Sequence, residues 1–133
     1  MNRIALLIAA MILLGGCASG IARMKGETAG DRYRPYVGTA IESFNAFRLD
    51  GWELAGPNEV VIWTGLNQAY LVTVWSSCQD LAFTNHVGLP TTSRTVSRMD
   101  SLRVGRDRCP IESIRPIDIK RYKEDLALQR EPK

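Results

Sequence analysis

The residues best suited to chemistry in this chain of 133 residues are its three cysteines and its single histidine. His86 follows Cys78 by eight residues, and the two can be combined as a thiol nucleophile and its base. Cys78 can instead pair with Cys109 in a disulfide. There is no Cys-x-x-Cys motif for thioredoxin-like redox chemistry, and no spacing of cysteine, histidine and carboxylate matches a zinc or copper site. We therefore expect no metal and no separate organic cofactor.

Carboxylates are scattered along the chain, mostly beside predicted turns. Two of them can converge as the acid and base of a glycan hydrolase, which needs a separation of about 5–10 Å. Solvated turn residues are the simpler interpretation, and neither a Gly-rich phosphate loop nor a Gly-x-Ser-x-Gly elbow follows a predicted strand. We expect no catalytic residues, and a small thiol or carboxylate hydrolase remains an alternative. The carboxylates considered are Asp50, Glu53, Glu59, Asp80, Asp100, Asp107 and Asp118.

The composition is that of one globular domain, with 45% apolar and 23% charged residues. The net charge of +3 gives no indication of nucleic-acid binding. At the N-terminus, Arg3 precedes an unbroken apolar run over residues 4–14. This run suits a secretory signal peptide and is shorter than the roughly 20 residues of a membrane-spanning helix. We therefore predict a signal peptide over residues 1–16.

The end of this segment, Leu14-Gly15-Gly16-Cys17, resembles the lipobox of bacterial lipoproteins. The resemblance implies that Leu14, Gly15 and Gly16 are recognised by the processing machinery and that Cys17 becomes the lipidated first residue. Two or more acyl chains anchor a protein stably. Because Ala18 rather than Asp follows the cysteine, the resemblance further implies the outer membrane of a Gram-negative bacterium, on its periplasmic side.

Lipidation of Cys17 would leave an even pair, Cys78 and Cys109, in an oxidising compartment. Such a pair favours one disulfide, which would close a loop of about 32 residues and stabilise the fold by roughly 3–4 kcal/mol. The reactive thiol with His86 as its base stays open as the alternative.

The mature chain divides into three parts by composition. Residues 17–37 carry the lipidated cysteine and a flexible tether of small, glycine and charged residues. A β-rich globular body is expected over residues 38–118. Residues 119–133 are expected to form a C-terminal helix and tail, because Ile119, Tyr122 and Leu126 recur at helical spacing.

Alternation of apolar, β-branched and aromatic residues predicts antiparallel strands throughout the body. A central hairpin is expected, with Trp63 opposite Tyr70 across a loop of four residues. Trp63 and Trp75 are predicted in the core, whereas Trp52 is predicted at the surface. The fold class is mainly β (α+β), an antiparallel sheet able to curl into a small, partly open barrel. The expected strands are 41–54 with a bulge near Asp50, 59–65, 69–76, 86–89, 91–96, 101–104 and a short edge strand at 109–116.

Part of the body resembles an uncharacterised family of small Gram-negative lipoproteins, a domain of unknown function. The likeness covers roughly residues 40–118 and brings no activity or ligand with it. The residues that carry it are Gly51-Trp52, Val60–Thr64, Tyr70-Leu71, Cys78–Leu81, Asp100, Arg108–Ile111, Ile114 and Pro116.

Charge is unevenly distributed along the body. Residues 38–90 carry a net charge of −4, from five acidic side chains and one basic one, and residues 91–123 carry +5, from nine basic and four acidic ones. The basic stretch from residue 94 to 123 can form a surface for an anionic partner, or the two halves can simply face each other. Its members are Arg94, Arg98, Arg103, Arg106, Arg108, Arg115, Lys120, Arg121 and Lys123.

These observations favour an outer-membrane lipoprotein acting as a non-enzymatic structural or interaction module of the cell envelope. Its membrane contact would be the lipid on Cys17, and its partner an envelope protein, an anionic lipid or a glycolipid. A binding module for an anionic envelope component, working through residues 94–123, is the first alternative.

Overall fold

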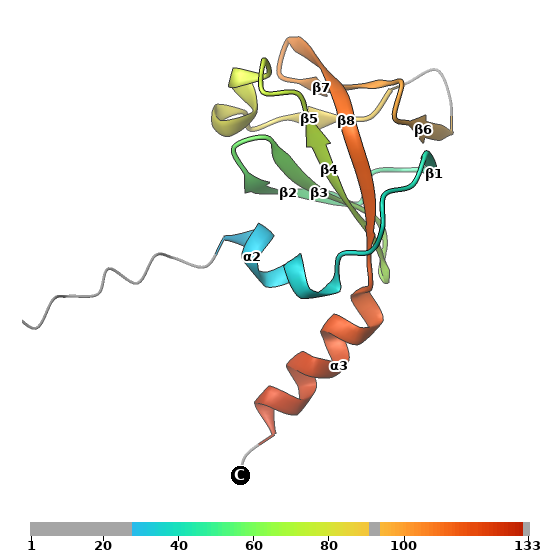
Figure 1. Cartoon of the computed structure of the whole chain (residues 1–133), viewed down its shortest axis with the longest axis vertical. Helices are drawn as coiled ribbons and strands as arrows, with labels where there is room; N and C mark the ends of the chain where they lie inside the picture. The colour runs from blue at the N-terminus through green and yellow to red at the C-terminus, as the bar shows by residue number, and fades with distance from the viewer. Residues whose placement is uncertain (1–27, 91–93, 132–133) are drawn as a thin grey trace, which may run out of the picture.

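The computed structural model describes residues 28–90 and 94–131, which form a mainly β body with a helix extending from one end (Figure 1). The strands are β1 (Ser43–Asn45), β2 (Gly51–Gly56), β3 (Glu59–Gly65), β4 (Gln68–Val74), β5 (Val87–Gly88), β6 (Thr95–Ser97), β7 (Ser101–Val104) and β8 (Asp107–Ile117). The helical segments are α2 (Ala29–Tyr33), η1 (Arg34–Tyr36), η2 (Gln79–Phe83) and α3 (Ile119–Arg130).

Six strands form one antiparallel sheet in the order β2-β3-β4-β8-β7-β5, and the sheet is nearly closed into a barrel. β1 and β6 form a separate antiparallel ribbon. A disulfide joins Cys78 to Cys109. The predicted fold class is therefore confirmed, including the barrel-like sheet, the C-terminal helix and the disulfide.

The central hairpin of β3 and β4 is present, but its predicted register is wrong by one residue. Trp63 lies opposite Ala69 rather than Tyr70, and Gly65 lies opposite Gln68. The register shifts between Trp63 and Gly65, so the turn that joins the strands has two residues instead of four. A bulge of this kind inserts one residue into one strand, and spacing in the sequence gives no sign of it.

β8 is the longest strand and lies inside the sheet, so the prediction of a short edge strand at 109–116 is wrong. Its first part pairs with β7 and its second part with β4, with a register shift beside Glu112. The predicted strand over 41–54 is also two strands, because β1 pairs with β6 whereas β2 pairs with β3.

Two apolar clusters occupy the two sides of the sheet. The larger one contains Val60, Ile62, Val72, Leu102 and Ile114, all fully buried, and it includes the disulfide. The second cluster lies on the other face of β2, β3, β4 and β8, beneath α2, η1 and the start of α3. Its members are Ala29, Tyr33, Ala55, Val61, Ala69, Leu71, Ile117 and Ile119.

Residues 28–37, predicted to belong to the flexible tether, are instead folded onto the body. Thr28 and Asp31 form a capping box at the start of α2, which satisfies backbone groups of the first turn. Gly30 lies so close to the backbone of Ala55 that a side chain there would collide with it. Tyr33 is 4% exposed, and burial together with the neighbouring Glu53 carboxylate raises its pKa to about 12.

The C-terminal helix begins as predicted, with the Asp118 side chain accepting a hydrogen bond from the backbone of Arg121. Tyr122 packs edge-on against Tyr33, with 4.9 Å between ring centroids, and against Tyr36 at 5.4 Å. The N-terminal and C-terminal segments therefore hold each other on one face of the sheet, while the second half of α3 extends away from the body.

Candidate functional site

The nine basic residues predicted as one patch are distributed over several surfaces. Arg94 stacks on Phe47, and Arg98 pairs with Glu42 at 3.5 Å, both at the β1–β6 ribbon. Lys123 donates hydrogen bonds to the β3–β4 turn. α3 and the β7–β8 turn lie at opposite ends of the molecule (Figure 1), so a single patch over 94–123 is wrong. The members on α3 or on the far part of β8 are Arg115, Lys120, Arg121 and Lys123.

Three of the nine gather on the β7–β8 hairpin. Arg103 of β7 lies directly opposite Arg108 of β8, and Arg106 occupies the turn. The neighbouring residues Leu102 and Cys109 are buried, so the two paired arginines lie on the outer face of the hairpin, where both are exposed. Arg103, Arg106 and Arg108 are called the basic face below.

The hairpin turns so tightly because of one glycine. Gly105 has φ +60°, a backbone conformation that side chains other than glycine rarely adopt. On the other side of β7, Gly88 of β5 lies opposite Arg103. A side chain at Gly88 would contact the first carbons of the Arg103 side chain, so the glycine leaves space for them.

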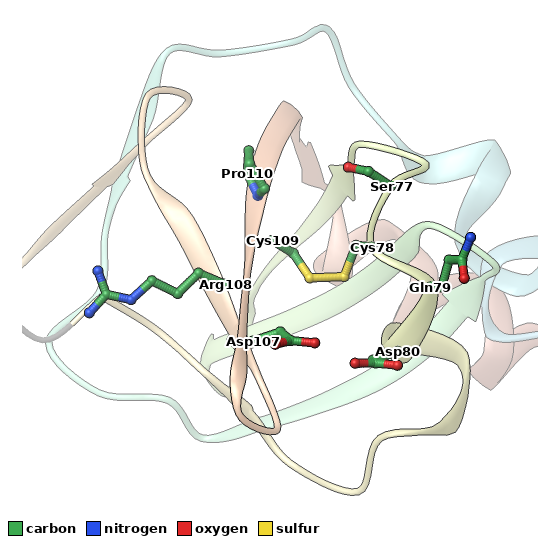
Figure 2. Close-up of a pocket in the computed structure, with 8 residues that line it drawn as sticks. All are labelled: Ser77, Cys78, Gln79, Asp80, Asp107, Arg108, Cys109 and Pro110. Carbon is green, nitrogen blue, oxygen red and sulfur yellow. A yellow bond between two sulfur atoms is a disulfide. The ribbon is translucent and has the colours of Figure 1, made fainter.

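A pocket of about 340 Å³ lies beside the disulfide, between the segment that begins at Ser77 and the first residues of β8, and Arg108 is among the residues that line it (Figure 2). Asp80 and Asp107 point toward each other there, each two residues from a disulfide cysteine. A hydrogen bond to Asp107, and the charge of Asp107, raise the pKa of Asp80. Two carboxyl groups in hydrogen-bond contact lie closer together than the acid and base of a glycan hydrolase.

The thiol alternative is wrong because the Cys78 sulfur is bonded to Cys109 and cannot act as a free nucleophile. The Cα atoms of the two cysteines are 5.4 Å apart. His86 lies instead at the start of β5, where its carbonyl accepts a hydrogen bond from Gly105.

The tryptophans differ partly from their predicted positions. Trp75 is 53% exposed because β4 ends one residue before it, whereas Trp52 packs against the larger core cluster. Trp63 packs against the second cluster, in agreement with its predicted place. A shallow hollow of about 420 Å³ lies beside Trp52 and Trp63, with Asp50 and Glu53 at its border, and both carboxylates have arginine partners.

A family of unknown function, DUF6491, matches the sequence over residues 1–133. The chain belongs to this family. Neither the curated proteins nor the solved structures contain a match. Membership of DUF6491 agrees with the resemblance to an uncharacterised domain family and brings no activity with it.

The predicted lipidation residues of this DUF6491 chain, Leu14, Gly15, Gly16 and Cys17, lie outside the described residues, as does the signal peptide. Across residues 28–90 and 94–131, no helix is long and apolar enough to cross a membrane. The same residues bring no three metal-binding side chains together.

Sequence reasoning missed the meeting of Asp80 with Asp107 and the pairing of Arg103 with Arg108. The contact between Asp80 and Asp107 was predictable, because a disulfide between Cys78 and Cys109 brings residues near the two cysteines together. The second required the register of β7 and β8, in which the turn at Gly105 decides which residues face each other.

Proposed function

We propose that this chain is a lipoprotein of the Gram-negative outer membrane whose body is a non-enzymatic interaction module on the periplasmic side. The sequence from Arg3 to Cys17, with its apolar run and lipobox-like end, supports the anchor. An interaction module is favoured over an enzyme because Cys78 is bonded in a disulfide and the Asp80 and Asp107 carboxyls contact each other at the exposed surface.

The docking of α2 is the observation that carries this proposal. Because the chain is folded from Thr28 onward, only residues 18–27 separate Cys17 from the body. A chain of this length reaches at most roughly 35–40 Å. A body attached in this way would stay within one molecular diameter of the lipid, at a fixed attachment point beside α2, which suits a module that contacts partners at the membrane.

Intact-mass spectrometry of the protein extracted from cell membranes tests the proposal. We expect a chain that begins at Cys17, carries acyl chains, and gains two hydrogens when the Cys78–Cys109 disulfide is reduced. The Cys17→Ser variant should lose the acyl mass and leave the outer-membrane fraction, whereas the neighbouring Ser19→Ala variant should behave as the wild type. An unacylated wild-type chain, or a Cys17→Ser variant that stays in the outer membrane, would contradict the anchor.

A binding module for an anionic envelope component is the second candidate function, and the structure reduces the set of residues that could bind the anion. Of the nine basic residues first considered, the three of the basic face lie together on one hairpin at the end of the body far from α3. They are the part of the basic stretch that supports anion binding.

A further inference from the structure

Within the described residues, none of the three arginines of the basic face forms an ion pair with a carboxylate. Arg103 and Arg108 occupy directly opposite positions on antiparallel strands, where side chains of like charge destabilise the pair. Four other arginines of the described chain have carboxylate partners, such as Arg34 with Glu59 at 3.1 Å. The nearest carboxylate along the chain, Asp107, points away from Arg108 and toward Asp80 (Figure 2).

An exposed aromatic side chain lies next to the same turn. Phe83, the last residue of η2, is 91% exposed. The following residue, Thr84, lies against the turn, because a side-chain carbon at Gly105 would be 3.7 Å from the Thr84 hydroxyl oxygen. The backbone N–H of Gly105 also donates a hydrogen bond to His86 at 3.0 Å. η2 and the hairpin turn therefore form one end of the molecule, opposite α3 (Figure 1).

Arginines beside an exposed phenylalanine suit the boundary between lipid headgroups and acyl chains. A guanidinium group binds phosphate oxygens through two parallel hydrogen bonds, and a phenylalanine ring can insert at the boundary between the headgroups and the acyl chains. An acidic protein would satisfy the arginines, but it gives no reason for a phenylalanine that is almost fully solvated beside them. The combination therefore favours a lipid surface.

We propose that the basic face and Phe83 dock the body onto the anionic headgroups of the membrane that holds the chain. This inference rests on the proposed anchor, which would keep the body at a high effective concentration near those lipids. The reach of residues 18–27 matches the size of a body of about 100 residues, which is roughly 35 Å across, so the hairpin end can turn to the membrane.

The expected strength follows from the number of arginines. Each basic side chain close to an anionic membrane surface favours the docked state by roughly fivefold, so three of them favour it by roughly a hundredfold. Phe83 would add to this by burying its ring. Because such contacts are exposed, salt should weaken them.

Tryptophan fluorescence in vesicles with brominated acyl chains measures the docking directly. The full chain purified from membranes is reconstituted into phosphatidylcholine vesicles with or without phosphatidylglycerol, and a new tryptophan is introduced by Phe83→Trp. Leu128→Trp, on the exposed far end of α3, is the matched control. The wild-type chain gives the signal of the three natural tryptophans.

We expect bromine to quench the tryptophan at position 83, but not the one at 128, in vesicles that contain phosphatidylglycerol. Replacing Arg103, Arg106 and Arg108 by Gln should lower the ratio of docked to free bodies by roughly a hundredfold and abolish the quenching. The same loss of charge at other exposed sites should leave the quenching unchanged. These control substitutions are Arg115→Gln, Lys120→Gln and Arg121→Gln.

Quenching at 83 that is equal without phosphatidylglycerol, or that survives the triple substitution, would overturn the proposal. No quenching at position 83 in these vesicles, which contain no other protein, would also overturn the proposal and would favour an acidic protein as the partner. The mass of the same sample reports acylation independently. An acylated chain without quenching would contradict the docking alone, and an unacylated chain that is quenched would contradict the anchor alone.

Discussion

The interaction between Asp80 and Asp107 is attractive or repulsive depending on whether the Asp80 carboxyl is protonated. When Asp80 is protonated it donates a hydrogen bond to Asp107, and when both groups are ionised their charges repel each other. Folding therefore raises the pKa of Asp80. The stability that this proton brings is full below about pH 4 and is lost as the pH rises through the raised pKa, because the folded state binds more protons there.

The Asp80→Asn variant should remove this dependence. Its amide donates a hydrogen bond to Asp107 at every pH, so we expect the variant to melt at a higher temperature than the wild type at pH 7. The two melting temperatures should approach each other as the pH falls toward 4. Thermal unfolding followed by circular dichroism measures both. Glu112→Gln, on the strand that carries Asp107, controls for the loss of one negative charge. Parallel pH profiles of the wild type and Asp80→Asn would contradict the prediction.

Individual residues were predictable from the sequence where a chemical rule names the partner. Once Cys17 is set aside for lipidation, the two remaining cysteines predict the Cys78–Cys109 disulfide, and the side-chain oxygen of Asp118 suits a helix cap. The exposure of Trp75 was not predictable in this way, because it depends on β4 ending at Val74.

Among the elements, the β7–β8 hairpin is stable despite the like charges at Arg103 and Arg108. Its inner face buries Leu102 and Cys109 in the main core, and the disulfide attaches the hairpin to the start of η2. These contacts are sufficient to hold the hairpin in place although Arg103 and Arg108 repel each other on its outer face, and the fold does not depend on that arginine pair. A surface kept for binding is expected to sacrifice some stability in this way.

Replacing Arg108 by Glu should convert the repulsive cross-strand pair into an attractive one. We expect the free energy of unfolding to rise by roughly 0.2–1 kcal/mol relative to the wild type, the range found for cross-strand pairs. Urea unfolding at low salt measures the change, and added salt should reduce it. Arg115→Glu makes the same change of charge opposite Leu71, where no arginine is paired with it. An equal effect of both substitutions would show that net charge, and not the pair, is responsible.

Helices and strands were predictable where they are long enough to show a periodic pattern of apolar residues, as in the β3–β4 hairpin and α3. α2 is only five residues long, too short for an amphipathic pattern, so its segment was indistinguishable from a tether by composition. The capping box formed by Thr28 and Asp31 was the one local signal of it. The central position of β8 could not be predicted from its sequence. It arises because β8 pairs with β7 along its first part and with β4 along its second part, and this pairing depends on the whole sheet.

For the whole molecule, the two ends of the described chain are coupled through α2. Tyr33 packs against Tyr122, and Tyr36 donates a hydrogen bond of 2.7 Å to Asp125, which raises the pKa of Tyr36. The charge asymmetry along the sequence did not predict this arrangement or the separation of the basic residues, because both depend on which strands are neighbours. If the chain is anchored at Cys17, α2 sets the length of free tether and thus how far the body moves from the lipid.

Gly30→Ala tests that coupling. The added methyl group would collide with the backbone of Ala55, which cannot move cheaply, so we expect α2 to leave the sheet and the free energy of unfolding to fall by about 1–3 kcal/mol. Hydrogen exchange should accelerate at the amides of 29–36 and also in α3, because Tyr122 loses its contact with Tyr33. Gly51→Ala, at a site with open space around it, should change neither. Faster exchange in 29–36 with an unchanged α3 would mean that α3 is held by its contacts with the sheet at Ile119 and with the β3–β4 turn at Lys123, and that the two ends are not coupled.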